Sequence, residues 1–474
     1  MTTATPPTPT TLGGLRASGH RYKAVKHELR DNLLARLADG GERFPGIVGF
    51  DDTVLPELER ALLAGHDIVL LGERGQGKTR LIRSLHHLLD EWTPVVAGCE
   101  INDHPYVPTC VACRGRLDEL GEELPVAWRH RSERYGEKLA TPDTSVGDLI
   151  GDIDPIKVAE GRTLGDPETV HYGLVPRTNR GIFSVNELPD LAERIQVALL
   201  NVLEERDIQV RGYQLRLPLD LLLIASANPE DYTNRGRIIT PLKDRFGAEV
   251  RTHYPLRLDD ELTLIRQEAV LAWDEEPLGR PVVPGHLLEV IARFTRAVRE
   301  SPQIDARSGV SARFAIAAAE TVAASAVRRA AVCGEEAAVA RMVDLWVIPP
   351  VSLGKVEFDQ LEEGRELDLL KHLLRRSVAE TWRARLAGSD LSGLLHRFDE
   401  GATVETGDLV PAGDLLARVG PVPGLAQLLR RLGDDSRAET PGLAAAALEF
   451  AMEGLHLAKR LAKEELPGRT VYGG

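Results

Sequence analysis

An eight-residue segment that begins at residue 72 constrains the fold of this chain more than any other feature. It follows the apolar run Ile68–Leu71 and leads into a helical pattern over Arg80–Leu89. A phosphate-binding loop lies between a strand and a helix in this way and has the pattern G-x-x-x-x-G-K-[ST]. The segment fits this pattern throughout: Gly72, Glu73, Arg74, Gly75, Gln76, Gly77, Lys78 and Thr79. We therefore predict a nucleotide-binding domain with a parallel sheet.

The residue types of this loop suit a nucleoside triphosphate. Glycines let backbone N–H groups turn toward the phosphates, and Lys78 brings a mobile positive charge to the β- and γ-phosphate oxygens. The hydroxyl of Thr79 can bind Mg²⁺. A glycine-rich turn that fits by chance is the alternative, which the flanking strand and helix disfavour. We predict ATP and Mg²⁺ as cofactors, bound by residues 72–79.

Polar side chains follow two further apolar runs. Ile182–Val185 leads into Asn186 and Glu187, and Leu221–Ala225 leads toward Asn228. Ligands bind at the carboxyl ends of the strands in such sheets, where Glu187 could polarise an attacking water and Asn228 could contact that water or the γ-phosphate. Asn186 stands where an acidic residue usually holds a water of the Mg²⁺ shell, and it brings no charge. Strands that merely end in polar residues, with Asn228 in an ordinary turn, remain the alternative.

The order of patterns along the chain indicates an α/β core followed by helices. Apolar runs alternate with helical patterns between residues 67 and 250, and the later pattern is wholly helical. Alternation over Ile208–Leu217 predicts a β-hairpin, and His20–Leu37 predicts a helix. The pattern predicts a flexible tail to about residue 18 plus a helix (1–43), an α/β core (44–255), a helical lid (256–348) and a mostly helical extension (349–474).

Charge and cysteine content narrow the classes of function. Asp and Glu number 72 against 58 Lys and Arg, which gives a net charge of −14, the wrong sign for a protein that mainly grips a nucleic-acid backbone. We expect no DNA partner. No uncharged run approaches the roughly 18 residues of a membrane span, so we expect no membrane association. Four cysteines in 474 residues do not suggest a disulfide framework, and we predict a cytoplasmic protein.

Together these motifs resemble the AAA+ ATPases, and within them the ATPase subunit of magnesium chelatase and the MoxR-like group. The resemblance runs from about residue 44 to residue 331. Phe44–Gly49 looks like the family's opening segment, residues 72–79 match Walker A, Gly181–Leu188 matches Walker B, and Asn228 stands at sensor 1. The resemblance implies a P-loop sheet flanked by helices, β-hairpin insertions and a helical lid. It also implies that the core (44–255) is an ATPase and that residues 97–180 are an insertion in it. Asn186 departs from the family's Walker B Asp, which affects catalysis rather than binding.

The resemblance also implies an active site shared between protomers. The segment Asp244-Arg245-Phe246 looks like the arginine-finger segment, in which Arg245 reaches the ATP of the neighbouring subunit. Arg313, which ends the stretch from Ser308, occupies the sensor 2 position. By the same resemblance we expect a homo-oligomeric ring, a hexamer, that works with a von Willebrand A-type partner protein.

Three functions compete. The first is an ATP-hydrolysing ring that remodels or activates a partner protein. The second is an enhancer-binding transcriptional regulator, but the G-A-F-T-G-A loop of that class is absent between Lys78 and Glu187, and no basic recognition helix is evident. The third is a nucleotide-dependent scaffold whose hydrolysis is weak because of Asn186. The sequence favours the first.

A cysteine-rich stretch in the insertion suggests a second cofactor. Cys99, His104, Cys110 and Cys113 lie close together in the sequence. Thiolates with an imidazole are ligands for structural Zn²⁺, and a loop-rich insertion lacks a core of its own. The alternative is a set of idle or buried thiols beside a surface histidine. The zinc hypothesis does not rest on the family resemblance.

Overall fold

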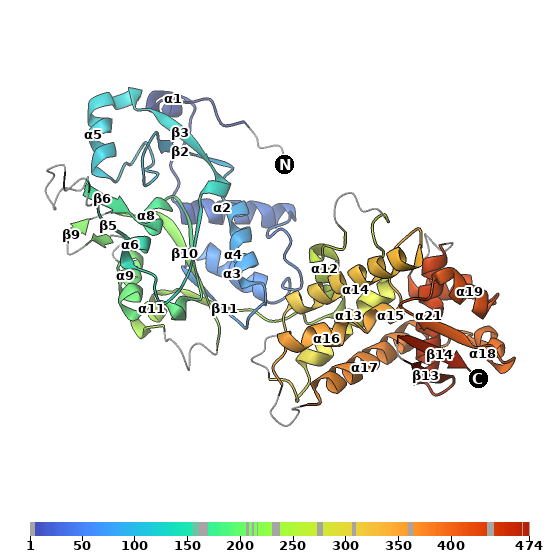
Figure 1. The fold of residues 1–474 in the computed structure, drawn as a ribbon. Helices are drawn as coiled ribbons and strands as arrows, with labels where there is room; N and C mark the ends of the chain where they lie inside the picture. Colours follow the sequence, from blue (N-terminus) through green and yellow to red (C-terminus); the bar gives the residue numbers. More distant parts are fainter. Residues whose placement is uncertain are drawn as a thin grey trace. The chain divides into compact units, whose positions relative to one another are not determined.

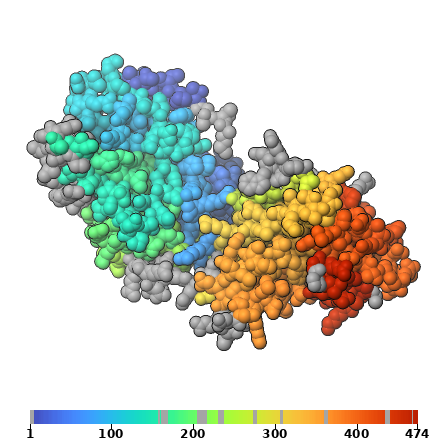
Figure 2. Space-filling model, viewed as in Figure 1, coloured from blue at the N-terminus to red at the C-terminus, as the bar shows by residue number. Residues whose placement is uncertain are grey.

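The computed structural model consists of two compact units, residues 1–253 and 254–474 (Figures 1 and 2). Figure 1 colours the first unit from blue to green and the second from yellow to red. The described residues are 5–154, 156, 159, 169–204, 208–210, 213–215, 217–229, 238–272, 278–305, 310–358, 364–433, 440–466 and 468–473.

A five-stranded sheet organises the first unit, and every neighbouring pair of its strands is parallel. Its order is β11-β1-β10-β7-β4. The strands are β1 (Ile68–Leu71), β4 (Tyr135–Leu139), β7 (Gly181–Asn186), β10 (Leu221–Ala227) and β11 (Ala248–Arg251). All five carboxyl ends therefore face one edge. The predicted parallel sheet is confirmed, and the three predicted apolar runs form β1, β7 and β10.

Helices cover both faces of this sheet, because each strand sends alternate apolar side chains to opposite sides. Ile68 and Leu70 of β1 belong to one hydrophobic cluster, whereas Val69 and Leu71 belong to another. The first cluster includes residues of α2 (Val25–Asp39), α3 (Val54–Leu63) and α4 (Lys78–Ser84), and the second includes residues of α9 (Glu193–Glu204) and α11 (Thr240–Arg245). The fold is thus a layered α/β domain.

Two of the predicted helices differ in their bounds. The helix predicted over His20–Leu37 starts at Val25 and ends at Asp39, where Gly40 adopts a left-handed conformation. The helix predicted over Arg80–Leu89 starts at Lys78 and ends at Ser84, and a 3₁₀ helix, η1 (Leu85–Leu88), continues it.

The start of the chain corrects part of the predicted flexible tail, since residues 9–17 contact the insertion or form a helix. Helix α1 (Leu12–Ala17) buries Leu12 and Leu15. The Leu12 N–H donates to the Leu124 carbonyl (3.0 Å), and the Trp128 indole donates to the Pro9 carbonyl (2.8 Å). The Pro- and Thr-rich composition concealed two leucines that pack against the insertion.

The insertion carries short antiparallel pairs and helices. Strand β2 (Trp92–Val96) pairs with β3 (Val126–His130), and β5 (Gly151–Ile153) pairs with β6 (Val170–Tyr172). Its helices include α5 (Val111–Leu120), α6 (Val146–Leu149) and α8 (Leu174–Arg177). The predicted hairpin is confirmed in its strands, β8 (Ile208–Val210) and β9 (Tyr213–Leu215), whereas residues 211, 212 and 216 lie outside the described part.

The second unit is mostly helical and has one hydrophobic core. Helix-spaced apolar residues are buried in it, among them Leu287, Val290, Ile291 and Phe294. Because the core runs from Leu262 to Tyr472, the division into a lid and an extension remains a prediction. The helices are α12 (Leu258–Glu268), α13 (Gly285–Arg299), α14 (Ala312–Cys333), α15 (Met342–Leu345), α16 (Ile348–Ser352), α17 (Glu366–Leu386), α18 (Ser392–Asp399), α19 (Ala412–Val419), α20 (Leu425–Leu432) and α21 (Pro441–Leu457).

A three-stranded antiparallel sheet, which the sequence did not indicate, lies within the extension predicted to be mostly helical (349–474). Strand β14 (Arg469–Gly473) lies between β12 (Val404–Gly407) and β13 (Ala462–Leu466). The strand β12 arises in a stretch rich in Gly, Pro and Thr that lacks an apolar run, and its partner lies far along the chain. Local pattern therefore could not reveal it. Among the described residues, no helix has both the length and the apolar character needed to cross a membrane.

Candidate nucleotide-binding site

The predicted phosphate-binding loop connects β1 to α4, as the sequence requires. Gly77 directly precedes α4 with a φ of 78°, in the left-handed region that favours glycine. A Cβ on Gly72 would lie 1.9 Å from Thr252 Oγ1 and 2.2 Å from Gln76 Oε1, so no larger residue fits there without displacing both. Backbone conformation and close packing thus explain these two glycines.

Lys78 is the buried cation of the loop, with a relative exposure of 6%. Its ammonium group donates to the Gly72 carbonyl, to the Glu73 carbonyl (2.9 Å) and to Asn228 Oδ1 (2.7 Å). A buried ammonium is costly unless hydrogen bonds satisfy it, and these acceptors do so. Two of them belong to the loop itself, and the third comes from the end of β10.

Asn228 connects Lys78 to the predicted catalytic carboxylate. Its Nδ2 donates to Glu187 Oε2 at 2.7 Å, while its Oδ1 accepts from Lys78. Glu187 directly follows β7 and has a φ of 56°, which is uncommon for a residue with a side chain. Left-handed residues of this kind cluster at functional sites, because the surrounding structure must hold them. The structure thus brings together three predicted site residues from three separate segments.

Asn186 contacts a carboxylate that the sequence analysis missed. Its Nδ2 donates to Glu137 Oε1 at 2.7 Å, and its Oδ1 accepts from the hydroxyls of Ser184 and Ser226 at 3.4 Å each. Glu137 lies on β4, directly opposite Ser184 in the register. The charge absent at position 186 is therefore present on the neighbouring strand.

Arg83 keeps Glu137 ionised. Its guanidinium donates to both carboxylate oxygens, at 2.8 and 2.9 Å, and the Tyr135 hydroxyl donates at 2.9 Å. The Arg83 hydrogen bonds lower the pKa of Glu137 below its usual value, against the opposing effect of burial. The strand Tyr-Gly-Glu-Lys-Leu, whose middle residue is Glu137, has no apolar run that would identify it in the sequence.

Thr252, which directly follows β11, fixes the loop from the other side. Its hydroxyl donates to Gln76 Oε1 at 2.8 Å, and the same oxygen accepts from the Glu73 N–H at 3.0 Å. A cavity of about 350 Å³ borders Gly72, Glu73, Gln76 and Thr252 and is also lined by Lys243 and Arg251. Space thus adjoins the loop, and both cations form ion pairs with Glu249, which also lines the cavity. Thr252 was not among the residues predicted from the sequence.

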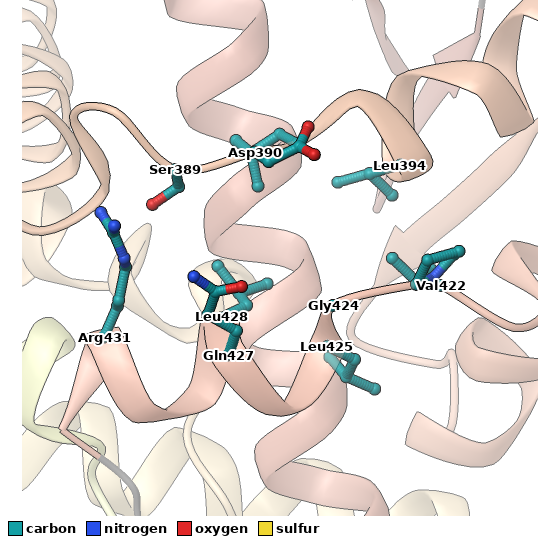
Figure 3. Close-up of a pocket in the computed structure, with 11 residues that line it drawn as sticks. Ser389, Asp390, Leu394, Val422, Gly424, Leu425, Gln427, Leu428 and Arg431 are labelled. Carbon is teal, nitrogen blue, oxygen red and sulfur yellow. The ribbon is translucent and has the colours of Figure 1, made fainter.

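A second pocket, in the second unit, is too small to compete. Figure 3 shows it between the segment of Ser389 and Asp390 and the helix that carries Gln427 and Arg431. Its volume of about 20 Å³ holds about one water molecule. The carboxyl edge of the first unit's sheet remains the candidate site.

Four other residues predicted for the ATP site lie at the loop, in α4, in α11 and in α14. Arg74 is exposed and Thr79 is half-buried, at the loop and the first turn of α4. Arg245 ends α11, is 46% exposed and forms an ion pair with Glu204. Arg313 lies at the start of α14 in the second unit, where it is exposed, and Ser308 lies outside the described residues. The roles predicted for Arg245 and Arg313 remain predictions.

The cysteines of the insertion come together, but with a different fourth residue from the one predicted. The potential ligand atoms of Cys99, Asp103, Cys110 and Cys113 all lie within 4.8 Å of one another. His104 instead stacks on His20, and its Nδ1 accepts the Tyr106 N–H at 3.1 Å. Burial lowers the pKa of His104 to about 3, so this imidazole stays neutral. The structure thus replaces His104 by Asp103 in the predicted ligand set.

The parallel sheet, with a phosphate-binding loop motif at its polar edge, resembles a P-loop domain of the AAA+ type. Comparison with known proteins makes the relation more specific. The family described as the Sigma-54 interaction domain matches residues 162–245. The magnesium-chelatase 38 kDa subunit of Acidiphilium rubrum is 30% identical over 223 residues, which cover 45% of this chain and 59% of that protein. The magnesium-chelatase subunit ChlI of Nostoc sp. is 30% identical over 216 residues, which cover 44% and 54%.

The chain therefore resembles the AAA+ ATPases and, within them, magnesium-chelatase ATPase subunits, as the motifs predicted. It spans about half the length of the curated relatives it matches. Similar solved structures include a putative ATPase from Cytophaga hutchinsonii, at 16% identity and a TM-score of 0.32, covering 76% of this chain and 97% of that one. Another is the complex between subunits BchI and BchD of magnesium chelatase, at 21% identity and a TM-score of 0.37, covering 71% and 95%.

Proposed function

We propose that this chain binds ATP with Mg²⁺ at the carboxyl edge of the first unit's sheet and hydrolyses it. The observation that carries the proposal is the connected series Lys78, Asn228 and Glu187, joined by hydrogen bonds of 2.7 Å. The side-chain amide of Asn228 contacts Lys78, a cation that can bind phosphate oxygens, and also Glu187, a carboxylate that can orient a water molecule. This is the arrangement that phosphoryl transfer to water needs.

The residues present fit ATP. Lys78 Nζ already faces acceptor oxygens of the loop, and phosphate oxygens can take the place of those acceptors by a rotation of one flexible side chain. Gln76 and Thr252 hold the loop from behind, beside the 350 Å³ cavity. The loop therefore needs little reorganisation to accept a triphosphate.

The residues also fit Mg²⁺, whose charge would neutralise the phosphate oxygens during transfer. Thr79 would bind the ion through its hydroxyl, and Asn186 would hold a water of its shell. Glu137 supplies the nearby negative charge through its hydrogen bond to Asn186. Glu187 orients the attacking water, and Asn228 couples its position to that of Lys78.

We further propose a ring, hexameric as in the resemblance, with Arg245 completing the site of a neighbouring protomer. Two observations support this assembly: Arg245 is 46% exposed, and its described ion pair is with Glu204 rather than with the site residues. In this proposal the short pairs β5–β6 and β8–β9 contact the partner protein. The proposed role is to remodel or activate a partner, of von Willebrand A type, as in the MoxR-like group. The unpaired cysteines suit a cytoplasmic location.

Phosphate release under steady turnover tests hydrolysis. Glu187→Gln should lower the rate by about 10²- to 10⁴-fold, because the base is lost, while ATP affinity is retained. Glu133→Gln, at an exposed surface ion pair, is the control and should behave like the parent. A wild type that binds ATP without releasing phosphate would instead indicate a scaffold.

A mixing experiment tests the shared site. Arg245→Ala and Glu187→Gln should each be inactive alone, and their mixture should regain part of the activity. Recovery is expected because a site with Glu187 from one protomer can then meet Arg245 from the other. Two inactive variants that remain inactive together, although they assemble, would contradict a site completed in trans.

One observation favours a second function. The match to the Sigma-54 interaction domain includes β7, β10 and the Arg245 segment, and it suits an enhancer-binding transcriptional regulator. The net charge of −14 opposes direct DNA binding. A gel-shift assay with genomic fragments at low salt separates the two functions, since only the regulator should retard DNA.

A further inference from the structure

We propose that the insertion of the first unit binds one Zn²⁺ ion through Cys99, Asp103, Cys110 and Cys113. The ligand set consists of three thiolate sulfurs and one carboxylate oxygen. This site lies apart from the residues proposed to bind nucleotide, and it stands or falls independently of the ATPase function.

The distances suit a tetrahedral ion. The four potential ligand atoms lie within 4.8 Å of one another. A tetrahedron with Zn–S bonds of about 2.3 Å has edges of about 3.8 Å, so bound metal would need only a slight contraction of the cluster. The described cysteines are all unpaired, and a disulfide would require a much shorter separation of two sulfurs, about 2.05 Å.

Local structure already aims the four groups at one point. Cys110 is the N-cap of α5, and Cys113 lies in the first turn of that helix, so the C-x-x-C pair shares one side. The Asp103 N–H donates to Cys99 Sγ (3.4 Å), and the Cys113 N–H donates to Cys110 Sγ (3.3 Å). Backbone N–H groups that point at sulfur stabilise the thiolate form that metal binding requires.

Asp103 is oriented as metal-binding carboxylates usually are. It is fully buried, Oδ1 accepts from the Thr109 hydroxyl at 2.5 Å, and Oδ2 accepts from the Cys110 N–H at 2.8 Å. Cys110 and Cys113 are 7% and 2% exposed. Burying a carboxylate among acidic thiols is unfavourable without a cation, because each group loses its hydration. A divalent ion removes that conflict.

Zinc is the metal that fits this chemistry best. Thiolates select soft or borderline ions, whereas Mg²⁺ and Ca²⁺ prefer oxygen ligands. Four protein ligands without an open position are typical of a structural zinc site rather than a catalytic one. Iron in a thiolate site is the main competitor, and metal analysis separates the two.

The metal would hold the loop of residues 97–113 against the rest of the unit. That loop contacts the segment leading into β7 at two points: Asn102 Nδ2 donates to the Arg177 carbonyl (2.6 Å), and Asn179 Nδ2 donates to the Ile101 carbonyl (3.0 Å). It also pairs with β2, since the Val96 N–H donates to the Asp103 carbonyl (2.8 Å). Zinc would therefore stabilise the insertion and the α1 segment packed beside it.

Metal analysis of the full chain, purified without chelators or a metal-affinity column, is the test. We expect about one zinc per chain and no stoichiometric iron. Cys113→Ser and Asp103→Ala should lose most of the zinc, and Asp103→Cys should restore it by supplying a fourth thiolate. His104→Ala is the matched control, one residue away, and should keep the metal.

Two further measurements, cobalt replacement and a count of free thiols, use wild-type protein and therefore do not depend on whether a variant folds. Wild-type protein loaded with Co²⁺ should show the intense absorption of tetrahedral cobalt thiolate, and denatured, unreduced protein should show four free thiols. The proposal is overturned by folded wild type that takes up neither zinc nor cobalt, by iron in the site, or by a disulfide among the three cysteines. Loss of zinc in His104→Ala but not in Asp103→Ala would refute the Asp103 assignment.

Discussion

The nucleotide edge and the cysteine cluster of the first unit are both buried polar sites, but they balance charge differently. At the nucleotide edge a cation, an amide and a carboxylate alternate in Lys78, Asn228 and Glu187, so that each donor faces an acceptor. In the cysteine cluster all four groups are acids, packed within 4.8 Å. The first site contains its own cation, Lys78, whereas the second has hydrogen-bond donors but gains a cation only when a metal ion binds.

This difference implies different dependence on ligands. Strand ends hold the nucleotide edge, and the hydrophobic clusters of the sheet hold the strands, so the edge should keep its shape without ATP. The cysteine loop has few regular hydrogen bonds of its own, and metal binding there should contribute folding free energy. The predictions below test this contrast.

Removal of the metal should have the largest effect. Structural zinc binds small peptides with an apparent free energy of about 10–16 kcal/mol, and loss of only about 3 kcal/mol would lower the unfolding temperature of a unit this size by about 6–12 °C. Calorimetry of reduced protein before and after chelation measures the change, and added zinc should reverse it.

Cys333→Ser serves as the control for that experiment, because Cys333 lies on α14 in the other unit. It should melt like the parent and respond equally to chelation. If zinc-free protein unfolds at the same temperature as the untreated protein, the contrast between the two sites is lost.

Substitutions at Glu137 and Asn186 should have the next largest effect, and that effect is on turnover. Glu137→Gln removes the charge beside Asn186, and a hydrogen bond to a charged group is worth about 1.5–3 kcal/mol, so turnover should fall about tenfold to a hundredfold. The double variant Glu137→Gln/Asn186→Asp restores one amide and one carboxylate and should recover much of the rate. Phosphate release as a function of Mg²⁺ concentration is the measurement.

The single variant Asn186→Asp completes this cycle. It places a second carboxylate against Glu137, and like charges at this distance raise the pKa of one of them. Its turnover should therefore depend more steeply on Mg²⁺ than that of the parent. A double variant no faster than Glu137→Gln would show that the pair does not act together.

Thr252→Val should have the smallest effect. It removes the hydroxyl that donates to Gln76 Oε1 while keeping the shape of the side chain. One neutral hydrogen bond is worth about 1 kcal/mol, so ATP should bind about fivefold more weakly. Thr53→Val, which removes an exposed contact to His253, is the control. Equal ATP affinities in both variants would exclude a role for Thr252 in holding the loop.

Sheet topology explains why much of the nucleotide site could be predicted. Parallel strands align their carboxyl ends, so apolar runs followed by Glu187 and Asn228 had to meet at one edge, near the loop after β1. Glu137 was missed because its strand is only partly buried and lacks an apolar run. Thr252 was missed because nothing local relates it to Gln76.

Loops have no rule comparable to the alignment of strand ends. For this reason His104 was predicted in the cysteine cluster where the structure has Asp103. The side chains of the adjacent residues Asp103 and His104 point in different directions. Those directions depend on the backbone angles of the loop, which the sequence pattern does not determine. Composition favoured the imidazole as a zinc ligand, whereas the fold turns it toward His20 and Tyr106. The same lack of local signal concealed α1 and the sheet of β12, β13 and β14.

Calorimetric titration with MgATP tests the central claim most directly, because it measures binding without requiring turnover, a ring or a partner. The account predicts saturable binding to wild type, unchanged binding to Lys23→Ala at an exposed ion pair, and none to Lys78→Ala that remains folded. Binding by Lys78→Ala equal to that of wild type, or no heat of binding with folded wild type, would contradict it.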